Sequence, residues 1–204
     1  MNLNIIIGVI ILLLLYYTYN YKENFSSSSS SSTVLNEKQL LFKRTLTDIG
    51  DILNRHNIKY FLFCGTALGA HREKKFIEHD HDIDIAIFDG EETFKKIINI
   101  MKKCPNFSYS HQFPKKSSID NITEVTFNHN VTNINVDIFM VYKINNTYTH
   151  YTYTSLCDLK PKQRCVFENK PFKIIDINFL GRQYKIPDKS FLTSNYGDDW
   201  HIKK

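Results

Sequence analysis

Apolar positions along the chain follow two spacings, and each spacing predicts a different element. Between residues 35 and 56 they recur every three or four positions, as on one face of an amphipathic helix: Leu35, Phe42, Leu46, Ile49 and Leu53. Residues 59–64 are aromatic and apolar, and residues 82–88 alternate acidic with apolar side chains, so both segments are predicted strands. Between them, residues 65–72 are predicted to turn into a short helix.

The pattern continues with one more helix and several strands. Asp89 followed by Glu92 resembles a variant capping box, and helical spacing then runs through four apolar residues: Phe94, Ile97, Ile98 and Met101. Alternating segments near residues 123–128, 134–141 and 147–154 are predicted strands. This order predicts an α/β (α+β) fold, a mixed β-sheet with helices packed mainly on one face.

The N-terminal part of the chain has a different composition. Residues 5–17 are apolar and uncharged, and tyrosines cluster at the end of this run, as at a membrane interface. A spanning helix needs roughly 20 apolar residues, which this segment reaches only with Leu3 and the tyrosines, so a signal peptide is the alternative. Because no Ala-x-Ala cleavage site follows, we expect an uncleaved anchor. The predicted organisation is an anchor over 1–22, a serine-rich linker over 23–34 and one domain over 35–204.

Composition narrows the class of protein. A chain of 204 residues is long enough for one domain with a real core and too short for two full domains. The formal charge of +5 is modest and the basic residues are spread along the chain, so nucleic acid is not an expected partner. Several Asn-x-Ser/Thr triplets favour a lumenal domain in the secretory pathway, whereas Lys22 favours the other orientation by the positive-inside rule. We expect a single-pass membrane protein with a lumenal domain.

The four cysteines do not form a metal motif, because the chain has no Cys-x-x-Cys pair. Cys64 is the last residue of the predicted strand over residues 59–64. We expect it to be a buried thiol in that strand. Cys157 and Cys165 flank a short loop, so they can form a disulfide if the domain lies in an oxidising compartment.

Asp82 and Asp84 are the leading candidates for chemistry. On a strand they share one face while the intervening isoleucines share the other. Neighbouring like charges repel, and folds usually tolerate such a pair where a cation or a raised pKa relieves the repulsion. Carboxylate oxygens suit Mg²⁺, with Mn²⁺ as the second choice, and the ion can also take phosphate oxygens of a nucleotide. The alternative is an exposed acidic strand, and Asp80 joins the pair only if the extended geometry begins that early.

A turn of small residues precedes the acidic strand. Gly65 and Thr66 can bring a backbone N–H and a hydroxyl to a phosphate, since the missing Cβ permits close approach. The alternative is a helix-entry turn with no ligand. Arg72 carries a planar fork of donors that can clamp a diphosphate or pair with neighbouring carboxylates.

Several motifs occur in a defined order along the chain. GTALGAHR occupies residues 65–72, FIEHDHDIDI residues 76–85, VDIF residues 136–139 and YGDDW residues 196–200. Together they closely resemble the nucleotidyltransferase core of the LicD and fukutin-related family, over about residues 38–201. His79, His81 and Lys75 stand where that family often has Trp, Asp and Gly.

The resemblance implies a function. It implies a nucleotidyltransferase-like fold in which Asp137 is a third carboxylate, either completing a metal site with Asp82 and Asp84 or accepting the proton of the attacking hydroxyl. It also implies transfer of a phospho-alcohol group, such as phosphocholine or ribitol phosphate, from a CDP-activated donor to a glycan. The alternatives are a metal-dependent glycosyltransferase with an Asp-x-Asp motif and a non-catalytic, membrane-tethered glycan-binding relative.

Overall fold

The protein is described by a computed structural model over residues 35–88, 90–113, 122–153 and 165–203. The chain divides into two units, Met1–Leu35 and Asn36–Lys204, and the second carries every element described below. The predicted anchor over 1–22 and linker over 23–34 lie outside the described residues. Within the described ranges, no helix combines the length and apolar character needed to cross a membrane.

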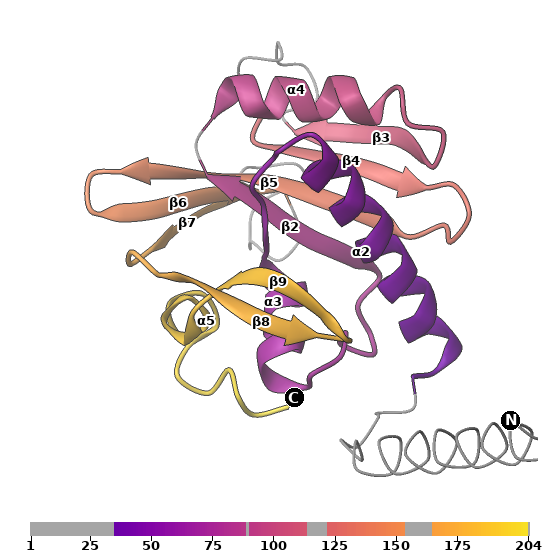
Figure 1. The fold of residues 1–204 in the computed structure, drawn as a ribbon. Helices are drawn as coiled ribbons and strands as arrows, with labels where there is room; N and C mark the ends of the chain where they lie inside the picture. The colour runs from indigo at the N-terminus through magenta and orange to yellow at the C-terminus, as the bar shows by residue number, and fades with distance from the viewer. Residues whose placement is uncertain (1–34, 89, 114–121, 154–164, 204) are drawn as a thin grey trace, which may run out of the picture. The chain divides into compact units, whose positions relative to one another are not determined.

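A mixed β-sheet, of seven strands over the described residues, forms the centre of the second unit (Figure 1). Its main path has the order β1 (Phe61–Leu62), β2 (Asp82–Phe88), β5 (Asn135–Ile144), β4 (Glu124–His129) and β3 (Phe107–Phe113). β2 and β5 are parallel, and the other neighbours in this path are antiparallel. The end of β5 also pairs with β6 (Thr147–Thr152), which pairs with β7 (Cys165–Asn169). A separate hairpin joins β8 (Ile174–Phe179) to β9 (Arg182–Pro187).

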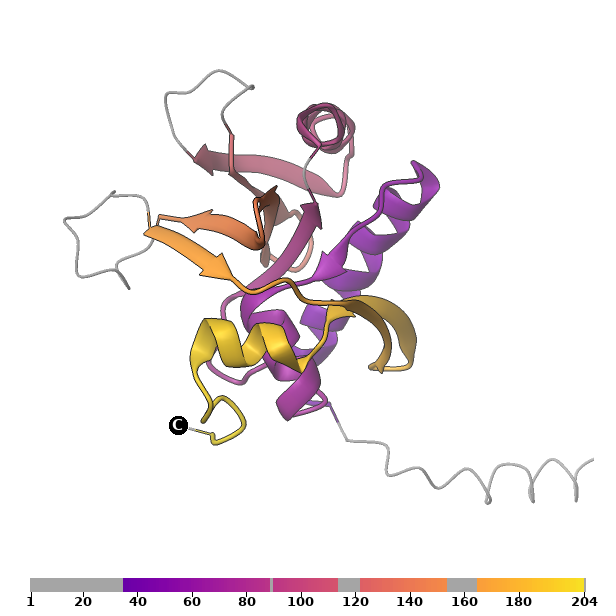
Figure 2. The ribbon, with the colours of Figure 1, turned by 90° about the vertical axis from the view of Figure 1, so that its left-hand side faces the viewer.

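Helices pack on both faces of the sheet. α2 (Glu37–Arg55) and α4 (Glu91–Met101) join the core that contains the isoleucines of β2. α5 (Lys189–Tyr196) joins a second core, in which the ring of Phe191 stacks on that of Phe63 with centroids 4.8 Å apart. In Figure 2, α5 lies in front of α3 (Cys64–Arg72), and α2 runs toward the upper right. The prediction of helices mainly on one face therefore holds for α2 and α4 and not for α5.

Alternation along β2 places the acidic residues. Ile83, Ile85 and Ile87 point into the core shared with α2 and α4, and each is at most 1% exposed. Because side chains alternate on a strand, Asp82 and Asp84 point to the opposite face, which is the face of α5. The two-residue alternation that buries the isoleucines of β2 thus also determines on which face Asp82 and Asp84 lie.

Two local predictions at helix starts were wrong. Cys64 is not in a strand: β1 ends at Leu62, and Cys64 is the first residue of α3, with a positive φ of 36°. The predicted capping box placed the start of α4 at Asp89, but the N-cap is Gly90, which has no side chain to accept a hydrogen bond, and Asp89 lies outside the described residues. Cys165 is disulfide-bonded, and Cys157, its predicted partner, lies outside the described residues.

Candidate active site

The register of the sheet brings distant carboxylates to one face. In the parallel pairing of β2 with β5, Asp84 lies directly opposite Asp137, and Asp82 lies opposite Asn135. In the antiparallel pairing of β4 with β5, Thr126 lies opposite Asp137 and Glu124 lies opposite Phe139. Directly opposed residues share a face, and neighbouring strands are about 4.8 Å apart. Asp82, Asp84, Asp137 and Glu124 therefore form one group, called the carboxylate cluster below.

The start of α3 holds the central carboxylate. Gly65 donates its backbone N–H to Oδ2 of Asp84 at 2.8 Å, and Asp84 donates its own N–H to the hydroxyl of Thr66 at 2.9 Å. A Cβ added at Gly65 would lie 2.8 Å from Oδ2 of Asp80 and 3.1 Å from Oδ2 of Asp84. A larger residue here would displace these two carboxylates from their positions beside α3. The structure also brings Asp80 to this end of α3.

Polar neighbours on β4 and β3 hold Asp137. The hydroxyl of Thr126 donates to Oδ1 of Asp137 at 2.5 Å and lies 3.2 Å from Nε2 of His111. With the hydroxyl hydrogen directed at Asp137, the imidazole Nε2–H of His111 donates to the Thr126 oxygen. Thr126 is 1% exposed, so this contact is protected from water and fixes the orientation of Asp137.

Burial raises the pKa of every carboxyl in the cluster, and the charges of neighbouring carboxylates add to the rise for Asp84, Asp137 and Glu124. Burial is the largest cause for Asp84, followed by the charges of Asp82 and Asp137, and it holds the pKa of Asp84 well above its ordinary value. Burial also raises the pKa of Asp82, and it raises that of Asp137 to about 6 against the hydrogen bond from Thr126. The pKa of Glu124 rises to about 8 because of burial and then of the Asp137 and Asp82 charges. These shifts mark a site where added positive charge would be favourable.

The residues of the cluster fit a divalent cation by charge and donor type. They are hard oxygen donors, and Oε2 of Glu124 is buried without a hydrogen-bond partner. They are not already gathered around one point, since no set of three or more His, Cys, Asp or Glu side chains among the described residues is arranged to hold an ion. The fit thus rests on the unbalanced negative charge of the cluster and on the unpartnered oxygen of Glu124. The carboxylate side chains would have to rotate to complete the coordination of an ion.

The cluster has two further neighbours that the sequence did not identify. Cys64 and Tyr196 have strongly raised pKa values, in each case chiefly because of burial and then because of nearby acidic groups. The contributors to Tyr196 include Cys64, Asp84 and Asp80, so the end of α5 approaches the carboxylates. Tyr196 belongs to the closing YGDDW motif of residues 196–200.

Arg72 does not meet the carboxylate cluster. It ends α3, whereas Gly65 lies near the start, and a helical rise of 1.5 Å per residue separates them by about 10 Å along the axis. Its guanidinium donates to Oε1 of Glu73 at 2.7 Å and to the carbonyl of Trp200 at 3.4 Å. Its Nε is buried without a partner. The predicted diphosphate clamp therefore stays a prediction, and Arg72 is held at the other end of α3.

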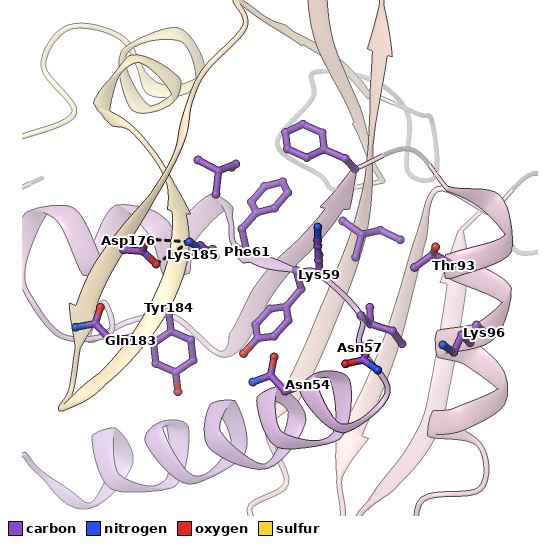
Figure 3. Close-up of a pocket in the computed structure, with 15 residues that line it drawn as sticks. Asn54, Asn57, Lys59, Phe61, Thr93, Lys96, Asp176, Gln183, Tyr184 and Lys185 are labelled. Carbon is purple, nitrogen blue, oxygen red and sulfur yellow. Dashed lines mark hydrogen bonds and ion pairs between the residues drawn. The ribbon is translucent and has the colours of Figure 1, made fainter.

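A cavity of about 950 Å³ lies elsewhere, beside the far end of β2 (Figure 3). Ile87 and Phe88 border it, and at about 3.3 Å per strand residue they lie roughly 10–13 Å from Asp84. Its acid, Asp176, is paired with Lys185 at 2.8 Å. Its other polar side chains are amides, amines and hydroxyls: Asn54, Asn57, Lys59, Tyr60, Thr93, Lys96, Gln183 and Tyr184. We place the chemistry at the carboxylate cluster because the repelling charges are there.

Fold and site together define an α/β domain with a multi-carboxylate site. Residues 57–189, more than half of the chain, match the family described as LicD/FKTN/FKRP, nucleotidyltransferase domain. The chain therefore belongs to this family, and the resemblance predicted from the motifs is confirmed.

Individual relatives are more distant. An uncharacterized protein of Rickettsia prowazekii, RP689, is 30% identical over 129 residues, which are 63% of this chain and 43% of that protein. The human ribitol-5-phosphate transferase FKTN is 22% identical over 152 residues, which are 74% of this chain and 31% of that protein. This chain thus spans less than half the length of these curated relatives. The lincomycin-bound crystal structure of the lincosamide antibiotic adenylyltransferase LnuA aligns with a TM-score of 0.47 at 15% identity, over 76% of this chain and 82% of that one.

Proposed function

We propose that the protein is a Mg²⁺-dependent transferase that moves a phospho-alcohol group, such as phosphocholine or ribitol phosphate, from a CDP-activated donor to a glycan hydroxyl. Family membership and the distant relation to a ribitol-5-phosphate transferase support this. The observation that carries the proposal is the direct pairing of Asp84 with Asp137 on parallel strands, beside Asp82. It joins carboxylates from distant parts of the sequence on one buried face.

In this proposal Asp82, Asp84 and Asp137 would hold the ion, and Mg²⁺ bound there would offset the negative charge of the donor diphosphate. Asp84 is suited to this because the N–H of Gly65 already orients one of its oxygens. Asp137 is suited because Thr126 occupies only Oδ1, which leaves Oδ2 available.

Asp137 also takes the proton of the attacking hydroxyl in this mechanism. A bond forms between the acceptor oxygen and the phosphorus of the transferred group. The bond between that phosphorus and the bridging oxygen of the diphosphate breaks, and CMP leaves with the electron pair. The hydroxyl proton passes to a carboxylate oxygen of Asp137, so charge and atoms balance.

Gly65, Thr66 and Arg72 complete the proposal as phosphate-binding residues. The hydroxyl of Thr66 accepts from the N–H of Asp84 and keeps its own hydrogen, which can be donated to a phosphate oxygen. Gly65 supports binding by allowing close approach of ligand and carboxylates to the backbone. Arg72 would need to exchange its contact with Glu73 for a phosphate.

The proposal includes attachment to a membrane. Residues 1–22 would anchor the chain and residues 23–34 would tether the domain in the lumen of the secretory pathway, where glycan acceptors are available. Limited proteolysis of membranes should release a soluble fragment starting in or just after the serines. Recovery of a mature chain without the apolar run would show a cleaved signal peptide instead.

Protection against thermal unfolding tests the proposed donor. A ligand that binds the folded state raises the melting temperature with its concentration. With Mg²⁺ present, CDP-ribitol or CDP-choline should raise the melting temperature of the wild type and leave that of Asp84→Asn unchanged. Stabilisation by UDP-sugars alone would favour the glycosyltransferase alternative. Stabilisation by a free glycan, with no nucleotide effect, would favour the non-catalytic relative.

A further inference from the structure

Glu124 is a fourth carboxylate on the face that carries Asp82, Asp84 and Asp137. It lies opposite Phe139 of β5 and opposite Phe113 of β3, so its carboxylate emerges between two aromatic residues. It is 6% exposed. Glu124 and Asp137 are diagonal neighbours across the β4–β5 pairing, a relation that places long side chains within reach of each other.

The hydrogen bonds of Glu124 are incomplete. Oε2 is buried and has no partner, whereas a buried carboxylate normally has its oxygens satisfied. A structural role would provide a basic residue or an N–H donor, as Gly65 does for Asp84. The residues paired with Glu124 across the sheet, Phe113 and Phe139, have no polar side-chain group, and its diagonal neighbour Asp137 is another acid.

A neutral, protonated carboxyl group would be the simplest other reading. Protonation would avoid the cost of burying a charge, but it gives no reason for a titratable group at this buried position. An apolar side chain between Phe113 and Phe139 would fill the same space without the cost of burying a polar group. An ion drawn to the neighbouring carboxylates explains both the retained acid and its unpartnered oxygen.

We propose that Glu124 is an additional ligand of the divalent cation, reaching from β4 with Oε2 to the ion held by Asp82, Asp84 and Asp137. This inference rests on the proposed function, because it assumes that a cation binds the cluster. It adds a ligand from a third strand, so that β2, β4 and β5 would all contribute oxygens.

Cation binding to the purified protein tests this without any assay of transfer. Mn²⁺ affinity is measured by electron paramagnetic resonance, and Mg²⁺ affinity by calorimetry, for the wild type, Glu124→Gln and Glu124→Met. Glutamine keeps the shape and methionine suits the aromatic surroundings, so at least one folded variant is expected. Glu91→Gln is the matched control, since Glu91 is exposed on α4.

We expect both Glu124 variants to bind Mn²⁺ at least about tenfold more weakly than the wild type, since loss of even an outer-shell partner weakens metal sites by roughly 10–100-fold. Glu91→Gln should bind like the wild type. Wild-type affinity in either folded Glu124 variant, with binding abolished in Asp84→Asn, would overturn the role of Glu124 and leave the proposed function standing. Equal weak binding by the wild type, Asp84→Asn and the Glu124 variants would overturn both.

Discussion

Two of the groups of buried polar side chains among the described residues differ in how their hydrogen bonds are satisfied. In the first, His129 is 1% exposed, and its Nδ1 accepts from the N–H groups of Val131 at 3.3 Å and Thr132 at 3.1 Å. Nε2 therefore carries the hydrogen and donates to Oδ2 of Asp48 at 3.0 Å. Thr132 in turn shares a hydrogen bond of 2.5 Å with Thr45 of α2. Both ring nitrogens of this histidine are paired.

The carboxylate cluster is the opposite case. Its members are all acids, their pKa values are raised, and one oxygen of Glu124 has no partner. A satisfied buried cluster joins elements and needs no ligand, whereas an unsatisfied one lowers stability and signals a binding site. We therefore interpret the His129 group as structural, connecting β4 to α2, and the carboxylate cluster as functional.

Removing the central carboxylate should have the largest effect on function. We expect Asp84→Asn to reduce Mg²⁺-dependent transfer to roughly one thousandth or less, the scale of losing one group that stabilises transition-state charge. The amide oxygen can still accept the N–H of Gly65, so the fold should persist, and the metal-free melting temperature should stay equal or rise as a like charge is lost. Turnover assays and thermal melts on the same sample check both statements. Normal turnover by Asp84→Asn and by Asp82→Asn would remove the metal assignment.

A substitution at Asp137 distinguishes the two roles that this carboxylate can have, general base and cation ligand. If Asp137 acts mainly as the base, Asp137→Asn should leave donor affinity nearly intact and reduce transfer by roughly 10²–10⁴. If it is chiefly a cation ligand, donor affinity and Mg²⁺ dependence should fall together with the rate. Donor Kd and turnover measured on this variant decide between the roles. Unchanged values for both would exclude Asp137 from the site.

The His129 group should respond to mutation only through stability. Asp48→Ala leaves the buried Nε2–H of His129 unpaired, which should lower the free energy of unfolding by about 1–3 kcal/mol. Asp48→Asn retains an acceptor oxygen and should recover most of this loss. Denaturant unfolding measures the change, and Mn²⁺ affinity should match that of the wild type in both variants. A weakened cation affinity in folded Asp48→Ala would contradict the separation of the two groups.

The pH dependence of metal-free stability is a smaller test of the cluster. Glu124 ordinarily titrates near 4.5 and here has a pKa of about 8, so over this interval the folded state binds a proton that the unfolded state has released. Stability from this group therefore falls as pH rises from about 4.5 to about 8, and Asp137 adds to the fall between 3.8 and about 6. Melting temperatures without metal should decline by a few degrees between about pH 5 and about pH 8, with a shallower decline in Glu124→Gln.

Saturating Mg²⁺ should counteract this decline, because it favours the ionised carboxylates. The stabilisation by Mg²⁺ should thus be larger at about pH 8 than at about pH 5. Identical pH profiles for the wild type and Glu124→Gln, each unaffected by Mg²⁺, would show that the cluster does not titrate as described.

Strong periodicity made part of the fold predictable. The alternation over residues 82–88 gave β2 with its observed bounds, and the helical spacings gave α2 and α4 to within a few residues. β1 proved shorter because α3 begins already at Cys64. β3 was missed although aromatic rings alternate with polar residues along it, because it has no aliphatic side chain and every residue after Phe107 is exposed or half-buried.

The site was predictable only where a residue pattern or a motif marked it. Asp82 and Asp84 followed from alternation, and Asp137 followed from the family motif. Glu124 lay in a predicted strand, but only the β4–β5 register shows that it shares a face with Asp137, and register is a tertiary property. The bond from Gly65 to Asp84 could not be predicted either, because it depends on how α3 packs against β2.

The central claim, that the carboxylates bind a divalent cation, is tested most directly by anomalous diffraction from crystals soaked in Mn²⁺. We expect one strong anomalous peak on the face of the sheet shared by β2, β4 and β5, coordinated by oxygens of Asp82, Asp84 and Asp137, and absent from Asp84→Asn crystals. A peak located only elsewhere, or no peak at saturating Mn²⁺ in a crystal whose cluster is open to solvent, would contradict the account.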